Sequence, residues 1–230
     1  MMDIRQFETL GHADHGWLDA RHHFSFSSYH DPKRMGWGAI RVWNDDTIAP
    51  NTGFPPHPHK DMEIITYVRS GAITHKDSMG NVGRTGAGDV QVMSAGTGVT
   101  HSEYNLESEP TTLFQIWIEA RNKNAKPGWG AKQFPKSSRS GQLEVLASGL
   151  GDEGALTIQA DARVLAATLE AGQSVEHVVG EGRHAYLVPA TGAIEVDGIA
   201  INARDGVALD AGNHTIKAVE ESEIVLVDAE

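Results

Sequence analysis

Short apolar runs, each interrupted by a turn sequence, make up most of this chain. The runs are rich in valine, isoleucine and aromatic residues, which favours strands over helices. Glycine, asparagine, aspartate or proline bounds them, and turn sequences such as SMGN, TGAGD and VDGI lie between them. The pattern predicts strands over residues 39–43, 63–68, 89–93, 113–118, 185–190, 193–196, 199–202 and 223–228.

Helical periodicity is weak throughout the chain. The least decided segment is residues 152–172, which is compatible with a helical turn but contains LTIQA and RVLAATL, whose apolar positions alternate as in strands. Many short strands joined by close turns are typical of a β-sandwich or a barrel. We therefore expect an all-β fold.

The chain resembles itself at two places. A segment that begins at Tyr67 and one that begins at Tyr186 share one order of features. Each has a strand, the sequence Gly-Ala-Ile, a turn, a short strand, a Gly-Asp or Asp-Gly pair, another strand and then Ala-Gly. One architecture used twice explains this order, and chance similarity between two glycine-rich β segments is the alternative. The polar stretch 123–142 is the candidate linker. We expect two domains, residues 1–135 and residues 136–230.

Composition excludes several classes of protein and site. A formal net charge of −12 argues against a nucleic-acid partner, because phosphate binding needs clustered lysine and arginine. The chain has no cysteine, which excludes disulfides and thiolate ligation of a metal. Neither a secretory leader nor an apolar run of about 18 residues is visible. A cytoplasmic protein without membrane contact is expected.

Two histidines one residue apart, in the sequence GFPPHPHKDMEI, are the first candidate for chemistry. Residues two apart on a strand share a face, so His57 and His59 point the same way. His101 and Glu103 form a second such pair. If the two strands are neighbours, about 4.7–4.9 Å apart, four groups converge. Three imidazoles and a carboxylate suit a divalent first-row metal. Histidines at turns satisfied by the backbone are the alternative.

Two carboxylates compete for the acidic position. Glu63 has the same parity as His57 and His59, so on a regular strand it faces the same side. It lies two strand steps, roughly 13 Å, beyond His59, and reaches the metal only if the chain bends. Glu103 needs no bend. Geometry therefore favours Glu103 as the ligand and leaves Glu63 as an alternative ligand or as a partner of a ligand.

At these residues the sequence resembles the pirin family of the cupin superfamily. The resemblance covers most of the N-terminal half and is looser in the C-terminal half. The matching segments are GHADHGWLDARHHFSFSSYHDP, RVWNDDTIAP, HPHKDMEIITYV, HKDSMGN, MSAGTGVTHSEYN and FQIWI.

The resemblance implies a bicupin, in which two double-stranded β-helix barrels pack together. It implies one metal in the N-terminal barrel, bound by His57, His59, His101 and Glu103. In many other cupins the acidic ligand stands at the place of Glu63. The second motif has Ser94 where other cupins usually have proline, and an insertion before His101, as pirins do.

The second barrel is expected to be degenerate. It has no His-x-His, and its histidines are scattered at His177, His184 and His214. We therefore expect no metal there. Helical or surface positions are expected for His12, His15, His22, His23 and His30, and a turn-proximal strand position is expected for His75. The tryptophans are expected to pack in the core or at a domain interface: Trp17, Trp37, Trp43, Trp117 and Trp129.

Within the family, the sequence is most similar to bacterial pirin-like bicupins with quercetin 2,3-dioxygenase activity. The resemblance implies a metal-dependent dioxygenase that opens the central ring of flavonols such as quercetin and releases carbon monoxide. The substrates would be a flavonol, or another small aromatic enol, and dioxygen. Glu103 would take the proton of the substrate hydroxyl. Phe54, Met62, Met93 and Phe114 are candidates for lining an aromatic pocket, with core packing as the alternative.

The sequence leaves more than one metal and more than one function open. The nitrogen and oxygen ligands fit iron(II), which we expect, and also manganese, cobalt, nickel, copper or zinc. One alternative function is a metal- or redox-sensing pirin that binds a protein partner. Another is a metal cupin enzyme that acts on a different enol. We expect a monomer, because the two barrels can bury each other's faces.

Overall fold

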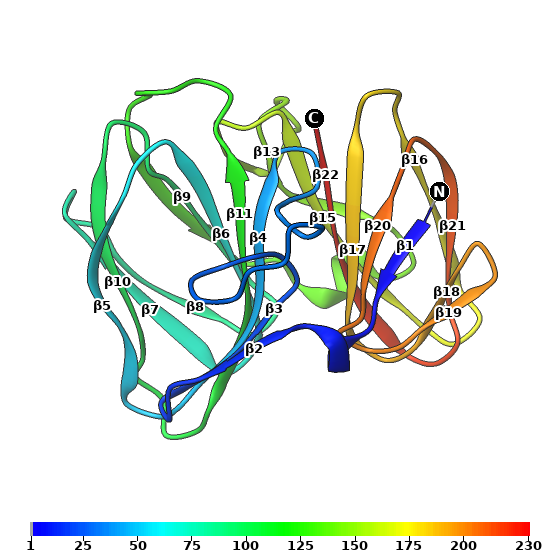
Figure 1. The fold of residues 1–230 in the computed structure, drawn as a ribbon, viewed down its shortest axis with the longest axis horizontal. Helices are drawn as coiled ribbons and strands as arrows, with labels where there is room; N and C mark the ends of the chain where they lie inside the picture. The colour runs from blue at the N-terminus through cyan, green and yellow to red at the C-terminus, as the bar shows by residue number, and fades with distance from the viewer. Residues whose placement is uncertain (1) are drawn as a thin grey trace.

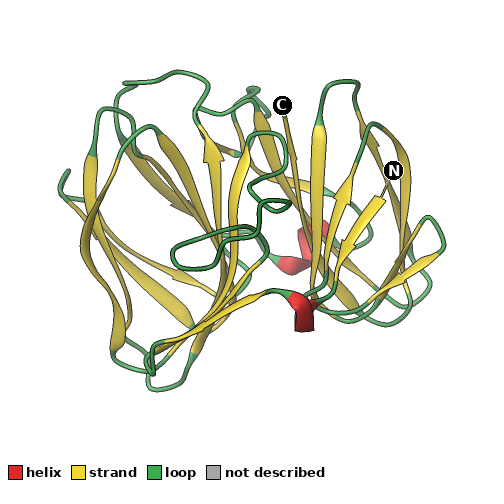
Figure 2. Ribbon diagram, viewed as in Figure 1, coloured by secondary structure: helices red, strands yellow, loops and turns green. Residues whose placement is uncertain are grey.

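The computed structural model describes residues 2–230, and strands dominate this range (Figures 1 and 2). The helices in it are two short 3-10 turns, η1 (Phe7–Thr9) and η2 (Lys136–Arg139). Neither of these described helices is long and apolar enough to cross a lipid bilayer. The predicted all-β class is confirmed.

A first unit, called the N-terminal unit, pairs a seven-stranded sheet with a four-stranded one. The larger sheet has the order β12-β9-β6-β11-β4-β3-β2, and the smaller has the order β5-β10-β7-β8. The strands are β2 (Gly11–Asp14), β3 (Leu18–His22), β4 (Ile40–Ile48), β5 (Thr52–His59), β6 (Met62–Ser70), β7 (Ala72–Asp77), β8 (Val82–Gly86), β9 (Val90–Ser94), β10 (Val99–Asn105), β11 (Thr111–Glu119) and β12 (Gly128–Lys132).

A second unit, called the C-terminal unit, has the same construction. Its seven-stranded sheet has the order β1-β20-β17-β22-β15-β13-β14, and its four-stranded sheet has the order β16-β21-β18-β19. The strands are β1 (Met2–Arg5), β13 (Glu144–Ser148), β14 (Leu156–Thr157), β15 (Ala162–Leu169), β16 (Ser174–Val179), β17 (His184–Thr191), β18 (Ile194–Val196), β19 (Ile199–Ile201), β20 (Gly206–Leu209), β21 (Gly212–Ala218) and β22 (Ser222–Ala229).

The two units repeat each other strand by strand. The order β9-β6-β11-β4 in one corresponds to β20-β17-β22-β15 in the other, and β5-β10-β7-β8 corresponds to β16-β21-β18-β19. Tyr67 lies in β6 and Tyr186 lies in β17, which are corresponding strands. The internal repeat predicted from the sequence is therefore confirmed.

Each large sheet is completed at its edge by a strand from a distant part of the chain. β1 pairs antiparallel with β20, so residues 2–5 belong to the C-terminal unit by their pairing (Figure 1). β12 pairs antiparallel with β9 in the N-terminal unit. The stretch 123–142 is thus more than a linker, since it holds β12 and η2 and buries Phe134 and Arg139. The division at residues 135 and 136 remains a prediction.

The predicted strands are all present, and most extend beyond the apolar runs that indicated them. The ambiguous segment 152–172 forms β14 and β15 rather than a helix. The histidine-rich N-terminal segment forms β2 and β3, so a helical position for its histidines was wrong. The polar and apolar residues of Leu18–His22 alternate with the period of two of a strand rather than the period of about 3.6 of a surface helix, and they point to opposite faces of the sheet.

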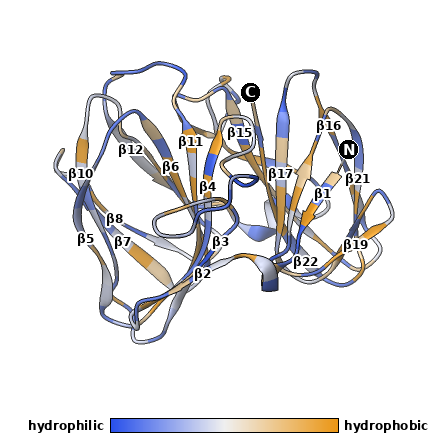
Figure 3. Ribbon diagram, viewed as in Figure 1, coloured by the Kyte–Doolittle hydropathy of each residue, from blue (hydrophilic) through white to orange (hydrophobic). Residues whose placement is uncertain are grey.

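The largest core lies between the two units. Trp43 and Phe114 of the N-terminal unit pack in one cluster with Tyr186 and Val225 of the C-terminal unit. A second apolar cluster fills the C-terminal unit. The N-terminal unit contains only two smaller clusters. Apolar segments are present in both halves of the molecule (Figure 3). Among the described residues, the N-terminal unit buries the larger set of polar side chains, which includes Asn44, Asp46, Gln91, Glu103 and Gln115.

Candidate metal centre and its cavity

Strand β5 explains the prolines around the two histidines. It is the edge strand of its four-stranded sheet, where proline, which has no N–H to donate, is tolerated. Its register against β10 shifts between the pair His101–His57 and the pair Glu103–Phe54. The extra residue lies at Pro55–Pro56, as expected for a β-bulge. The bulge changes the direction of the part of β5 that carries His57 and His59.

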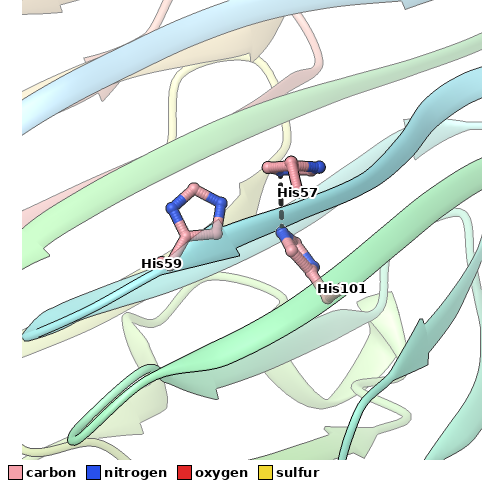
Figure 4. A group of neighbouring side chains, drawn as sticks. All are labelled: His57, His59 and His101. Carbon is pink, nitrogen blue, oxygen red and sulfur yellow. Dashed lines mark hydrogen bonds between the residues drawn. The ribbon is translucent and has the colours of Figure 1, made fainter.

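Three imidazoles converge between β5 and β10 (Figure 4). His57 and His101 are cross-strand partners, and their Nε2 atoms lie 3.1 Å apart. The ring of His59 lies 4.8 Å from that of His57 and 4.9 Å from that of His101, between centroids. One nitrogen from each ring lies within 4.8 Å of the others. The structure therefore brings together the three histidines that the sequence singled out.

The hydrogen bonds of His57 fix the direction of its lone pair. Its Nδ1 lies 2.7 Å from the carbonyl oxygen of Pro55. A carbonyl only accepts, so Nδ1 carries the proton and donates it to Pro55. In the neutral ring Nε2 then keeps its lone pair, and it faces His101. A ring N–H donated to a backbone carbonyl is the usual support of a metal-binding histidine.

His59 and His101 are suited to bind a cation rather than a proton. Burial, with His101 and His57 nearby, lowers the pKa of His59 to about 4. Burial, with His57 and His75 nearby, lowers the pKa of His101 to about 3. The Nε2 atom of His59 is buried and has no hydrogen-bond partner among the described residues. A buried unpartnered nitrogen beside two other imidazoles fits a metal ion.

Glu103 lies in the same interior but is held by the opposite sheet. Its Oε1 accepts hydrogen bonds from Thr66 at 3.0 Å and from Gln91 at 2.7 Å, and its Oε2 accepts one from Gln115 at 2.8 Å. The possible ligand atoms of His75, His101 and Glu103 form a second group within 4.8 Å of one another. Glu103 is thus near His101, but it is not part of the group that contains all three histidines.

Glu63 points away from the histidines. Its Oε2 accepts hydrogen bonds from Ser94 at 2.5 Å and from the backbone N–H of Gln159 at 2.9 Å. The expected shared parity with His57 is lost because β5 ends at His59 and a turn follows, with Asp61 at φ 51°. The next strand therefore directs Ile64, not Glu63, into the cavity. We do not retain Glu63 as an alternative ligand.

His75 is a buried residue of the site whose role the sequence did not reveal. It lies in β7, as expected of a strand residue, but its Nδ1 is 3.5 Å from Nδ1 of His101. Its Nε2 lies 3.0 Å from Oδ2 of Asp77. Burial alone would raise the pKa of Asp77, but hydrogen bonds from His75 and Asn81 outweigh it and lower the pKa. The spacing His-x-Asp in a strand next to β10 was the available signal.

A cavity of about 470 Å³ opens beside the three histidines. One part of its wall is aromatic and another is polar, and the segment from β2 to β3 contributes to both through Trp17 and His22. Phe54 lines the cavity as predicted. Phe114 belongs instead to the apolar cluster between the two units, and Met93 belongs to a smaller cluster against which Met62 packs. The lining includes His15, Trp17, His22, Phe26, Asn44, Asp46, Phe54, Ile64, Glu103, Gln115 and Trp117.

Asp46 contributes an unpaired carboxyl group to this wall. It lies in β4, is 2% exposed, and its Oδ1 has no hydrogen-bond partner among the described residues. Burial, with Asp45 and Glu103 nearby, raises the pKa of Asp46 well above its usual value. The neighbouring polar residues are paired with each other, since Nδ1 of His22 lies 2.8 Å from Oδ1 of Asn44.

The C-terminal unit keeps only part of this arrangement. His177 and His214 are cross-strand partners in β16 and β21, as His57 and His101 are in β5 and β10. They are therefore less scattered than the sequence indicated. His177 pairs with Asp228, and His214 pairs with Asp197. Val179 and Ile216 follow two residues later, at the places that His59 and Glu103 occupy in the other unit.

Family models match both halves of the chain. The model described as "Pirin" matches residues 3–118. The model described as "Quercetinase C-terminal cupin domain" matches residues 145–229. Apart from β1, the first matched range lies in the N-terminal unit, and the second lies in the C-terminal unit.

Relatives match the chain along its whole length. A "Pirin-like protein" of Caulobacter vibrioides is 62% identical over 231 residues, which are 100% of each chain. A "Quercetin 2,3-dioxygenase" of Escherichia coli K12 is 41% identical over 231 residues, covering 99% of this chain and 98% of the relative.

Solved structures confirm the fold class. The crystal structure of YhhW from Escherichia coli superposes with a TM-score of 0.95 at 38% identity, covering 100% of this chain and 98% of that one. A structure of bacterial pirin YhhW in complex with nickel(II) gives a TM-score of 0.94 at 38% identity, covering 100% and 99%. The predicted bicupin fold is therefore confirmed.

Proposed function

The chain belongs to the pirin family of cupin proteins, and on that basis we propose that it is a metal-dependent dioxygenase acting on flavonols such as quercetin. The reaction opens the central ring of the flavonol with dioxygen and releases carbon monoxide. The naming of the E. coli relative as a quercetin 2,3-dioxygenase supports this substrate class.

The observation that carries the proposal is the convergence of His57, His59 and His101 beside a cavity of about 470 Å³. We assign these three histidines and Glu103 as the ligands of one divalent metal, with iron(II) as the expected ion. Manganese, cobalt, nickel, copper and zinc accept the same ligands. A metal held by these residues would supply Lewis-acid chemistry that favours the deprotonated hydroxyl of the substrate.

The cavity walls bind and orient the substrate. Trp17, Phe54 and Trp117 give it aromatic faces, and the rings of Trp17 and Phe54 meet edge to face with centroids 5.1 Å apart. Flat aromatic ligands pack well against such walls, and the walls exclude water from the reacting atoms. The polar wall beside Asn44 and Asp46 matches the oxygen-bearing edge of a flavonol.

Glu103 is the residue we assign to proton transfer. A carboxylate offers about four lone-pair positions, and three here accept hydrogen bonds from Thr66, Gln91 and Gln115. The position that remains is on Oε2. Oε2 is therefore the atom that takes the proton of the substrate hydroxyl or binds the metal. The three donors fix the carboxylate in the orientation it needs for either role.

We further propose a cytoplasmic monomer without a nucleic-acid partner. The net charge of −12 disfavours binding to phosphates. The two units bury a shared apolar cluster between them, so the chain covers these sheet faces without a second copy.

Metal analysis combined with aerobic quercetin turnover tests the proposal. We expect about one metal per chain, turnover that is lost on chelation, and recovery on adding metal back. His57→Ala and His101→Ala should lose both bound metal and turnover. His12→Ala is the matched control, because this histidine is solvent-exposed on β2 and its side chain pairs with Asp19 at the surface. Full activity in a metal-free His57→Ala protein would refute the proposal.

Bound metal without quercetin turnover would separate the metal site from the reaction. In that case the ligand assignment stands and the dioxygenase assignment fails. The test would then move to metal-dependent binding of a protein partner or to turnover of another enol.

A further inference from the structure

His101 has each of its ring nitrogens directed at another histidine. Its Nε2 lies 3.1 Å from Nε2 of His57, in the candidate metal centre, and its Nδ1 lies 3.5 Å from Nδ1 of His75. A neutral imidazole carries one proton, so one nitrogen donates and the other keeps a lone pair. His101 can bind a metal through Nε2 only if the proton is on Nδ1.

Asp77 determines where the proton of His75 lies. Its Oδ2 is 3.0 Å from Nε2 of His75 and accepts a second hydrogen bond from Nδ2 of Asn81 at 2.8 Å. Its Oδ1 accepts from the backbone N–H groups of Met79 and Asn81 at 2.9 and 3.0 Å. A carboxylate in such a ring of donors acts as an acceptor, so Nε2 of His75 carries the proton. Nδ1 of His75 is then an acceptor that faces His101.

The ring of His75 is held in the plane that this contact requires. It stacks on the indole of Trp129 with centroids 4.9 Å apart and planes 11° apart. Trp129 lies in β12, and a side chain at Gly83 would collide with its indole. His75 is fully buried, so no water competes for its nitrogens. His101 therefore donates a hydrogen bond to His75, and His75 donates one to Asp77.

We propose that Asp77 and His75 are positioning residues that hold the proton of His101 on Nδ1 and thereby present the Nε2 lone pair to the metal. The inference rests on the proposed metal site but not on the flavonol reaction. Partners of this kind orient metal-binding histidines in many proteins, and their loss typically costs about 10–100-fold in metal affinity.

Asp77→Asn tests whether Asp77 determines which ring nitrogens of His75 and His101 carry the proton. The amide of asparagine can donate to Nε2 of His75, which allows the His75 proton to move to Nδ1. That proton would face Nδ1–H of His101 and drive the His101 proton to Nε2. Without metal, the Nε2 lone pair of His57, 3.1 Å away, competes with His75 for the proton of His101. We therefore expect the two-dimensional ¹⁵N–¹H spectrum of the histidine rings, recorded without metal, to show a larger Nε2–H fraction of His101 in Asp77→Asn than in the wild type. Nickel(II) affinity, measured by competition with a chelator, should fall about 10–100-fold.

Two variants of His75 separate this role from simple packing. His75→Asn keeps an acceptor oxygen near the position of Nδ1, whereas His75→Leu has similar bulk and no acceptor. We expect His75→Asn to bind nickel(II) nearly as well as the wild type and His75→Leu to bind it about tenfold more weakly or worse. Both keep Asp77 and its turn, so they decide the question even if Asp77→Asn fails to fold.

Asp197→Asn is the matched control, because Oδ2 of Asp197 pairs with Nδ1 of His214 at 2.7 Å in the C-terminal unit. It should leave nickel(II) affinity unchanged. Unchanged His101 signals in Asp77→Asn, or equal nickel(II) affinity in wild type, His75→Asn and His75→Leu, would overturn the proposal. If the wild type binds nickel(II) and the variants behave as expected while quercetin is not consumed, only the dioxygenase assignment fails.

Discussion

Gln115 donates a hydrogen bond of 2.8 Å from its Nε2 to Oε2 of Glu103. Gln115 lies in β11 of the seven-stranded sheet, and Glu103 lies in β10 of the four-stranded sheet. The bond therefore crosses the interior of the N-terminal unit, as does the 2.7 Å bond from Gln91 of β9 to Oε1. The orientation of the Glu103 carboxylate therefore depends on both sheets, because β10 carries Glu103 and the opposite sheet supplies the donors Gln91 and Gln115.

Gln115→Leu should therefore impair the site without removing a ligand. Leucine has a similar size but no N–H, so Oε2 of Glu103 loses the donor that orients it. We expect quercetin turnover or metal affinity to fall about 10–100-fold. Steady-state kinetics together with metal analysis measure the two effects. Wild-type values for both in a correctly folded Gln115→Leu protein would show that this hydrogen bond has no functional role.

His59→Ala should abolish stabilisation by metal while leaving the metal-free protein nearly as stable as the wild type. The Nε2 atom of His59 has no hydrogen bond to lose, since it is unpartnered among residues 2–230. A ligand that binds the folded state stabilises it by about 2.7 kcal/mol when present at a hundred times its Kd. Thermal unfolding with and without nickel(II) measures this. A rise in Tm in His59→Ala equal to that of the wild type would exclude His59 as a ligand.

The three histidines could be predicted from the sequence because they fall in two local pairs, His57 with His59 and His101 with Glu103. A period of two on a strand places the members of each pair on one face, and the resemblance to pirins implied that the two pairs converge. The failure at Glu63 has a physical cause, which is the turn at Asp61 with its positive φ. A parity argument holds within one strand and says nothing beyond its end.

Other features depend on contacts between distant segments. Nothing local in the stretch 123–142 indicates that β12 pairs with β9, because an edge strand needs no apolar alternation to form a backbone ladder. The burial of Arg139 likewise follows from partners far away in the sequence. His75 acquires its place beside His101 only through the pairing of β7 with β10.

Asp46→Asn should stabilise the protein at neutral pH. Burial, with Asp45 and Glu103 nearby, raises the pKa of Asp46 well above its usual value. The folded state then holds a proton that the unfolded chain releases, so stability falls as pH rises above about 4 toward the folded-state pKa. Asparagine has nearly the same shape and does not ionise.

Urea unfolding of the wild type and Asp46→Asn at pH 5 and at pH 8 tests this sign. The advantage of the variant should be larger at pH 8, by about 1.4 kcal/mol for each unit by which the folded-state pKa of Asp46 exceeds 5. The difference between the two proteins removes the contributions of other titrating groups. An advantage that is equal at both pH values would show that Asp46 titrates normally in the folded state.

Arg139→Met should destabilise the whole molecule, because Arg139 joins the two units. Its Nη2 donates to Oε1 of Glu223 in β22 at 2.7 Å and to the hydroxyl of Tyr67 in β6 at 2.8 Å, and its Nη1 donates to the carbonyl of Gly88 at 3.1 Å. Glu223 is buried, and its remaining cation is the half-exposed Lys136. Removing one partner of a buried ion pair typically costs about 3–5 kcal/mol.

Urea unfolding of three proteins gives the measurement and its controls. Arg139→Met should lose about 3–5 kcal/mol, whereas Arg163→Met, which removes a partly exposed pair with Asp152, should lose less than about 1 kcal/mol. Adding Glu223→Leu to Arg139→Met should restore part of the loss, because the unpaired buried carboxylate is then absent. If Arg139→Met costs no more than Arg163→Met, the apolar cluster around Trp43 and Tyr186 suffices to hold the two units together, and the buried pair contributes little.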